Sequence, residues 1–224
     1  MDRPSVSIRC GKISVVILAL GILPAVGCQS LMLTAIYLFQ GMDVDPDFAK
    51  LKEKKVVVVC RPAATLQYRN ANIGRDLAQQ VTDLLQKNVP KIKTVDQRKV
   101  AKWTDENTWE EYPEVGKALK AEMVVGIDVE NFDLFQGQTL YQGRASITVR
   151  VYDCKDHDKV VFEKIIPESV YPPSVGIPTS DRNETDFRRE FIHVLADQVA
   201  RHFYEHDPNA DIAQDADTLV NKSK

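Results

Sequence analysis

The sequence predicts an α/β fold: a mixed sheet in the order β-α-β-α-β-β-β-α, with the last helix packed on the sheet. Three patterns carry this prediction: a continuous β-branched run at residues 55–60, helical spacing of apolar residues at 73–85, and strict alternation at 144–152. The first three strands alternate with helices, which favours parallel pairing among them. The later strands follow one another as a meander.

The β-branched run Lys55–Cys60 ends before Pro62, as expected of a strand buried on both faces and therefore central in the sheet. Apolar residues then recur at helical spacing over Ile73–Leu85. Asn72 is a residue type that caps helix starts, and Asn88 precedes Val-Pro, which marks the stop. This segment is therefore expected to be a helix.

The middle of the chain predicts further alternation of strands and helices. Ile92–Val95 is expected to be a short strand, and Asp96 can cap a short helix that continues through Val100. Glu111–Ala121 is a third helical stretch, and Met123–Val129 begins a third strand that can extend to Leu134.

The clearest alternation of apolar and polar residues in the chain predicts an antiparallel strand with one face exposed to solvent. Its two faces are Ala145, Ile147, Val149 and Val151 on one side and Arg144, Ser146, Thr148 and Arg150 on the other. A turn at 153–159 leads to a fifth strand at 160–166, and a long loop with prolines follows at 171–183. The last helix, at 185–206, presents a largely apolar stripe to the core.

Residues 1–30 have the organisation of a secretory signal: a basic start, a short apolar run and small residues before a cysteine. The apolar run Ile13–Gly27 would span roughly 22 Å as a helix, at about 1.5 Å per residue. That is shorter than the ~30 Å hydrocarbon core of a bilayer. Ala25–Cys28 resembles the lipobox of bacterial lipoproteins, in which a diacylglycerol thioether forms on the cysteine before cleavage, so Cys28 is the candidate lipidation site.

Two other interpretations of the leader stay open. Apolar character resumes over Leu31–Phe39, so Ile13–Phe39 could be one uncleaved membrane anchor. An ordinary cleaved signal is the third alternative. The expected organisation is a signal peptide or anchor at 1–27, a membrane-proximal apolar stretch and tether at 28–51, a single α/β domain at 52–207, and a disordered tail at 208–224.

The charge balance argues against nucleic acid as a partner. The chain has 29 basic and 32 acidic residues, and removal of residues 1–27 leaves 26 and 31, a net charge of −5. A mildly acidic domain of mixed signs lacks the basic surface that nucleic acids require. Outside the leader and Cys28, the remaining cysteines are Cys60 and Cys154, which either form one disulfide in an oxidising compartment or stay as free thiols.

No catalytic residue, metal site or cofactor is predicted. His202–His206 matches H-x-x-E-H, the inverted zinc-protease signature, yet Pro208 ends the helix and no predicted helix supplies a third ligand. An alternative function is a small-ligand-binding or enzymatic domain at the carboxyl ends of the parallel strands, where Cys60, Arg61 and Asp128 would meet.

Aromatic side chains offer a candidate surface for a protein partner. Trp103, Trp109 and Tyr112 lie between predicted helices, where they either pack against the sheet edge or contact a partner. Tyr171, at the start of the long loop, is a further member of this candidate surface.

The order of elements, together with four passages, resembles the amino-terminal domain of TolB and its relatives. These relatives include curli-secretion lipoproteins and the lipoprotein activators of penicillin-binding proteins. The passages are the Val56–Val59 strand, the Ile73–Leu85 helix, Lys93–Asp96 and, above all, Glu114–Gly126. The resemblance covers residues 55–152. It implies a bacterial envelope lipoprotein, anchored to a membrane through its N-terminus with its domain in the periplasm. Such a protein binds an unidentified protein partner or further copies of itself, without catalysis.

Overall fold

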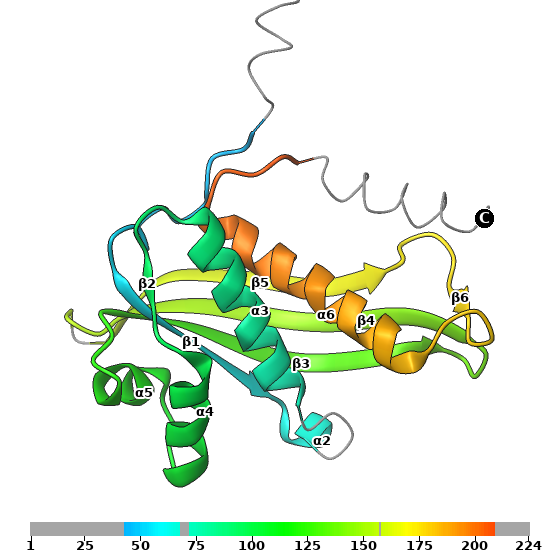
Figure 1. The fold of residues 1–224 in the computed structure, drawn as a ribbon, viewed down its shortest axis with the longest axis horizontal. Helices are drawn as coiled ribbons and strands as arrows, with labels where there is room; N and C mark the ends of the chain where they lie inside the picture. Colours follow the sequence, from blue (N-terminus) through cyan, green and yellow to red (C-terminus); the bar gives the residue numbers. More distant parts are fainter. Residues whose placement is uncertain (1–42, 68–71, 157, 209–224) are drawn as a thin grey trace, which may run out of the picture. The chain divides into compact units, whose positions relative to one another are not determined.

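The computed structural model describes residues 43–67, 72–156 and 158–208. The compact unit that begins at Val44 holds every helix and strand of these residues (Figure 1). The elements, in chain order, are β1 (Lys55–Pro62), α2 (Ala64–Gln67), α3 (Ile73–Asn88), β2 (Lys93–Thr94), α4 (Gln97–Glu106), α5 (Tyr112–Ala118), β3 (Met123–Gln136), β4 (Leu140–Asp153), β5 (Lys159–Tyr171), β6 (Ile177–Pro178), α6 (Glu184–Ala200) and the 3₁₀ turn η1 (Arg201–Phe203).

The predicted α/β class with a mixed sheet is confirmed. The sheet order is β2-β1-β3-β4-β5, and β6 pairs with the first residues of β4, Leu140 and Tyr141. β1 is parallel to both β2 and β3, whereas β3, β4 and β5 form the expected antiparallel meander. The β-branched run of β1 is indeed central, because β2 and β3 bond to its two edges.

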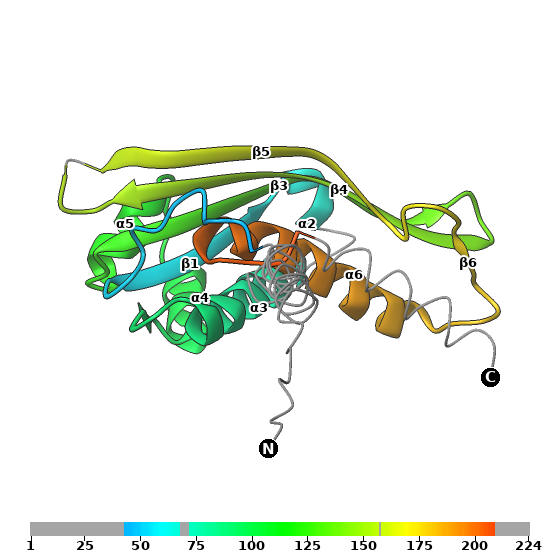
Figure 2. The ribbon, with the colours of Figure 1, turned by 90° about the horizontal axis from the view of Figure 1, so that it is seen from above.

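Helices cover one face of the sheet over much of its length. α3 and α6 bury their apolar sides on the face that carries Val56, Val58, Ile127 and Val149. Figure 2 shows these two helices together on one side of the strands. The alternation of β4 predicted this core face correctly, since Ala145 through Val151 alternate into the same cluster.

The second face is covered over only part of its area. α4 and α5 pack on Val57, Val59 and Val124, with Tyr152 of β4 at the margin, and no residue of β5 joins this cluster. The ring of Tyr112 lies directly on Gly126, where an added Cβ would come within 2.9 Å of the ring. The remainder of this face, toward the carboxyl end of β1 and across to β5, has no helix over it.

The chain ahead of β1 is packed against the domain. Phe48 is 6% exposed and Leu51 is fully buried, so the packed chain begins before the boundary expected at residue 52. Val44 and His206 exchange two backbone hydrogen bonds of 2.8 and 3.2 Å, which place the two ends of the described chain side by side (Figure 1). We call Val44–Leu51 the strap.

Several element boundaries differ from the sequence prediction. The predicted Asp96 cap is present, since its side chain accepts from the Arg98 amide. α4 then continues to Glu106 rather than ending at Val100. The last helix ends at Ala200, and the chain passes through η1 instead of reaching His206 as one α-helix. The long loop contains β6, which bonds to β4.

The leader, with Cys28 and both apolar stretches, lies outside the described residues, as do the last sixteen positions of the tail. Within the described part of the chain, no helix has the length and apolar character needed to cross a bilayer.

Replacing Phe48 by alanine is expected to lower the free energy of unfolding by about 3–5 kcal/mol, the usual cost of removing a buried phenylalanine. Its ring packs on Phe162 and Phe203, with centroid distances of 5.5 and 6.4 Å. Urea denaturation measures the change. Val44→Ala, at a strap residue that is 43% exposed, is the control and should change stability by less than about 0.5 kcal/mol.

The strap also predicts a dependence of stability on pH. His202 Nδ1 lies 2.9 Å from Asp47, and burial lowers the pKa of His202 despite the opposing effect of this carboxylate. The unfolded chain therefore binds a proton more readily, so stability falls as the pH drops below about 6.5. His202→Gln should flatten this fall between pH 7 and pH 5 in urea denaturation. An unchanged slope would assign the pH dependence to other groups.

Candidate functional site

Four charged side chains form a row across the open part of the second face. Arg61 on β1 donates to Asp128 on β3 at 3.2 Å, and Arg150 on β4 donates to the other oxygen of Asp128 at 3.0 Å. Arg150 also donates to Glu163 on β5 at 2.8 Å. The row therefore crosses four strands with alternating charge, and we call it the charged row.

The β1 end of the charged row is anchored by aromatic rings. The Arg61 guanidinium lies over Tyr112 and Trp109, 4.8 and 5.6 Å from their ring centroids, and donates to the backbone oxygen of Glu110 at 2.8 Å. Tyr112 donates its hydroxyl hydrogen to Asp128 at 2.8 Å. Cation–π contacts of this kind hold an arginine in place without neutralising it.

Electrostatics keep the hydroxyl of Tyr112 and the thiol of Cys60 protonated. Burial raises the pKa of Tyr112, and the charge of Asp128 raises it further. Burial likewise raises the pKa of the Cys60 thiol, again with a contribution from Asp128. A protonated thiol is a poor nucleophile, so Cys60 is unsuited to thiol catalysis.

Next to the charged row, the open face combines an exposed apolar side chain with a hollow. Ile165 on β5 is 63% exposed and pairs in register with Thr148, whose hydroxyl donates to Glu130 at 3.0 Å. A hollow of about 520 Å³ lies where β1 ends, between the start of α2 and β3. Its lining includes Arg61, Pro62, Ala63, Ala64, Glu130 and Arg150.

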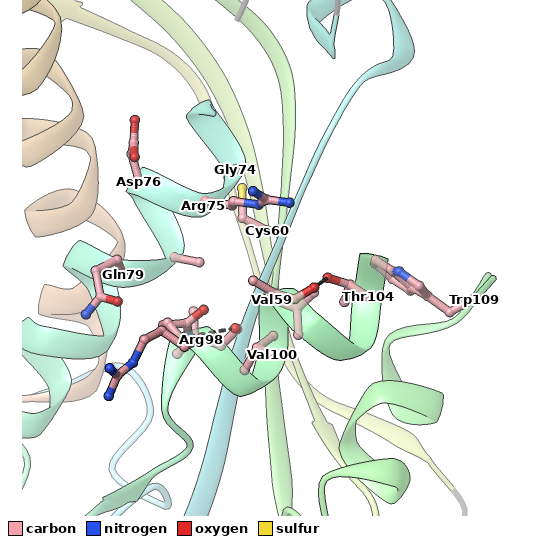
Figure 3. A pocket seen from close by; sticks show the side chains of 14 residues that line it. Val59, Cys60, Gly74, Arg75, Asp76, Gln79, Arg98, Val100, Thr104 and Trp109 are labelled. Carbon is pink, nitrogen blue, oxygen red and sulfur yellow. Dashed lines mark hydrogen bonds between the residues drawn. The ribbon is translucent and has the colours of Figure 1, made fainter. Parts of the chain in front are cut away.

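A separate cleft of about 300 Å³ opens between α3 and α4 (Figure 3). Val59 and Cys60 on β1 form part of its floor, and Val100 lines it from α4. Arg75 of α3 and Asp105 of α4 form an ion pair at 2.6 Å that joins the two helices bordering the cleft.

Most of the polar side chains that line the cleft are engaged with other protein groups. Gln97 donates to the backbone oxygen of Val58 and to Thr82, at 3.0 and 2.8 Å. Thr104 donates to Ala101, and Arg98 pairs with Asp96. The cleft therefore presents an apolar floor without a set of convergent, unpartnered polar groups of the kind that ligand sites use.

Two of the four aromatic side chains predicted as a partner surface belong to the core. Tyr112 is 1% exposed and Tyr171 is 5% exposed, and the Tyr171 hydroxyl donates to Glu190. Trp103 and Trp109 are half-buried against the second cluster. The prediction of a contact surface is wrong for the two tyrosines, because the alternative, packing against the sheet, is what buries them.

The two cysteines do not form a disulfide, since both thiols are free. Cys60 packs against the first cluster and Cys154 against the second, on opposite faces of the sheet. They also lie at opposite ends of the strands. Cys60 pairs in register with Ile127, whereas Cys154 follows Asp153, the partner of Met123.

The alternative site at the carboxyl end of the parallel strands is only partly assembled. Arg61 and Asp128 meet in the charged row, but the neighbouring Cys60 belongs to the opposite face. The two histidines of H-x-x-E-H do not converge either: His202 contacts Asp47, and His206 contacts the backbone of Tyr204. No cluster of metal-binding side chains occurs among residues 43–67, 72–156 and 158–208.

Sequence reasoning missed Arg150 and Glu163 as members of a common row. The alternation of β4 placed Arg150 on the wet face, which is correct. Its partners could not be read from this pattern, because Asp128 and Glu163 reach Arg150 only through the strand register. Asp128 was singled out, but for its position at the end of a parallel strand.

No protein-family model matches the chain, and no curated protein matches it significantly. Among solved structures, the PelC dodecamer from Paraburkholderia phytofirmans is similar over 70% of this chain and 92% of that chain, with 13% identity and a TM-score of 0.43. The lipoprotein GNA1162 from Neisseria meningitidis is similar over 65% and 97%, with 11% identity and a TM-score of 0.41. A minor lipoprotein from Acinetobacter baumannii is similar over 72% and 95%, with 15% identity and a TM-score of 0.31.

Two of these three structures are lipoproteins by name, and none of the three is TolB. With TM-scores below 0.5, the likenesses concern the general arrangement of the chain and decide neither a family nor a function.

Tyr112→Phe is expected to lower the free energy of unfolding by about 1.5–3 kcal/mol, because a buried hydrogen bond to a charged group is lost. Tyr152→Phe is the matched control. Its ring lies beside that of Tyr112, with 5.7 Å between the centroids and an angle of 31° between the planes, and its hydroxyl makes no hydrogen bond to the described part of the chain. Urea denaturation of the two variants should separate them. Equal losses would mean that the hydrogen bond to Asp128 contributes nothing.

Proposed function

We propose that the protein is a membrane-anchored lipoprotein of the bacterial cell envelope whose domain faces the periplasm and acts as a non-catalytic protein-binding or assembly module. The main observation in support of a protein-binding role is the open part of the second sheet face. A sheet face without a covering layer, with Ile165 63% exposed on it, is a surface that a protein partner can bury. Cys28 and the preceding apolar run support the anchor.

The chemistry of the described residues supports binding rather than catalysis. Every member of the charged row is already paired with an opposite charge, and the Cys60 thiol is kept protonated by burial. The alternative, a small-ligand or enzymatic domain, would use the cleft between α3 and α4. It is the weaker candidate because most of the polar side chains there are already bonded to other groups of the protein.

The proposal keeps the finer resemblance to the amino-terminal domain of TolB. The resemblance is drawn from the order of the elements along the chain, and strands and helices alternate in the structure up to β3, before consecutive strands. On this proposal the strap determines where the tether from Cys28 reaches the domain. Only residues 29–43 remain between them, which at most span about 50 Å when fully extended.

The anchor is tested by metabolic labelling with a radioactive fatty acid. Cys28→Ala should abolish the label, because the thioether can form only on that sulfur. Cys10→Ala, which removes the other cysteine of the leader, is the matched control and should keep the label in full. Label that persists in Cys28→Ala would contradict the proposal that the protein is a lipoprotein. A Cys28→Ala protein that stays in the membrane fraction without label would support the uncleaved anchor instead.

Protein binding is tested by placing a photo-crosslinking amino acid at position 165 in intact cells. Position 193 on α6, where His193 is exposed, is the matched control. Adducts from position 165, identified by mass spectrometry, with few or none from position 193, are the expected result. Equal or absent crosslinking from both positions would contradict a binding role for the open face.

A further inference from the structure

Lysines gather at the end of the sheet where the strap leads into β1. Residues 50–55 and 87–93 together hold seven lysines and one acidic residue, a net charge of +6. The chain without residues 1–27 carries a net charge of −5, so its remaining residues together carry −11. The charge of this chain is therefore strongly polarised, although its total is only mildly negative.

The fold brings the two lysine segments together. The backbone N–H of Lys93 donates to the carbonyl oxygen of Lys54 at 2.9 Å, and the parallel pairing of β1 and β2 places Lys55 beside Lys93. In Figure 1 the strap, the end of α3 and the starts of β1 and β2 meet at one end of the sheet. We call the surface formed by the following six lysines the basic end: Lys50, Lys52, Lys54, Lys87, Lys91 and Lys93.

Most of the positive charge of the basic end is not neutralised within the chain. Lys91 forms an ion pair with Glu53 at 3.2 Å, and Lys54 lies 3.7 Å from Glu122. Like charges gathered on one surface repel one another, and an anionic surface laid against them relieves this repulsion. The other four lysines are exposed and form no ion pair with any residue that the structure describes: Lys50, Lys52, Lys87 and Lys93.

We propose that the basic end binds the anionic phospholipid headgroups of the membrane to which the chain is anchored. This inference rests on the membrane anchor of the proposed function and adds a second, electrostatic contact with the same bilayer. The tether of residues 29–43 spans at most about 50 Å. It therefore holds the basic end close to the bilayer surface, where clustered lysines are attracted to anionic lipids and a tethered contact forms at high effective concentration.

The charge distribution favours one orientation of the domain. An anionic bilayer attracts the basic end, whereas it repels the excess of acidic residues on the rest of the chain. The strap also contains acidic residues, but Asp47 is paired with Lys164 at 3.1 Å. An acidic protein is the other class of partner that such a surface fits. The membrane is favoured because the tether already holds it within reach.

This orientation leaves the open face accessible to a protein partner. β1 begins at the basic end and reaches the charged row at Arg61, six residues beyond Lys55. At about 3.3 Å per residue, the separation is roughly 20 Å. The Debye length at physiological salt is only about 8 Å, so the headgroup charges do not act on the charged row. The two proposed contacts therefore use opposite ends of the same strand.

The test measures how fast individual lysines of the full-length protein are acetylated, with mass spectrometry as the readout. The protein is reconstituted into vesicles of phosphatidylcholine, with or without about 30% phosphatidylglycerol. Acetylation of Lys52, Lys87 and Lys93 should slow about threefold or more in the anionic vesicles, because nearby phosphates shield the amines and keep them protonated. The effect should disappear in 1 M salt, where the Debye length is about 3 Å. Lys102, on α4 outside the basic end, is the internal reference and should react equally fast in both kinds of vesicle.

The double variant Lys52→Glu with Lys93→Glu tests the same contact by charge reversal. It should abolish the slow acetylation of Lys50 and Lys87 in anionic vesicles, whereas Lys102→Glu is the matched control and should preserve it. All three replaced side chains are exposed, so the fold is expected to persist, and circular dichroism checks this.

Flotation of the same vesicles separates the two claims. A chain that floats with neither kind of vesicle would overturn the anchor and this inference together. A chain that floats, but whose basic end is acetylated equally fast in both kinds of vesicle, would overturn this inference alone and leave the anchor in place. Lysines that are protected in intact envelopes but not in anionic vesicles would also overturn it, and would assign the basic end to an acidic protein.

Discussion

One carboxylate organises the open face of this domain. Asp128 accepts hydrogen bonds from Arg61 on β1, Tyr112 on α5 and Arg150 on β4. Three elements far apart in the sequence are thus joined at a single side chain that is itself part of β3. A half-buried carboxylate needs such donors, because burial without them would penalise its charge. The arrangement also brings the two arginines to one surface without leaving either unpaired.

The constraint has a consequence for packing on the second face. The Tyr112 ring lies on β3 over Gly126, which provides the space for it, and from there its hydroxyl donates to Asp128. α5 is thereby fixed over the amino-terminal part of the parallel strands. The carboxyl end of β1 and the outer strand β5 remain without a helix. The covered and open parts of this face are therefore two results of the same contact.

The parts of this structure that depend on local sequence patterns could be predicted from the sequence. Three such patterns correspond to observed elements: the β-branched run of β1, the alternation of β4 and the Asp96 cap. They could be predicted because the burial of a strand and the capping of a helix depend on residues that are close together in the sequence. Features that depend on pairing between distant segments could not be predicted from local patterns. The register that joins Arg150 to Asp128 and Glu163, and the burial of Tyr171 against α6, arise only when the sheet is assembled.

The strap is a second example of a feature that depends on distant contacts and that local patterns do not predict. Val44–Leu51 has the composition of a tether, with acidic residues around a proline, yet Phe48 and Leu51 are core residues. Their burial follows from a contact with β5 and η1, more than a hundred residues away in the chain. Consequently, the two ends of the described domain meet, and the open face lies on the side of the sheet opposite to the helices that the strap supports.

The central claim, that the open face of the sheet binds a protein partner, is tested most directly by photo-crosslinking from Ile165 in intact cells. Position 193 on α6, which packs on the other face of the sheet, is the reference. The account predicts adducts with a partner protein from position 165 and few or none from position 193. Equal or absent crosslinking from the two positions, with both variants folded and present in the same membrane, would contradict it.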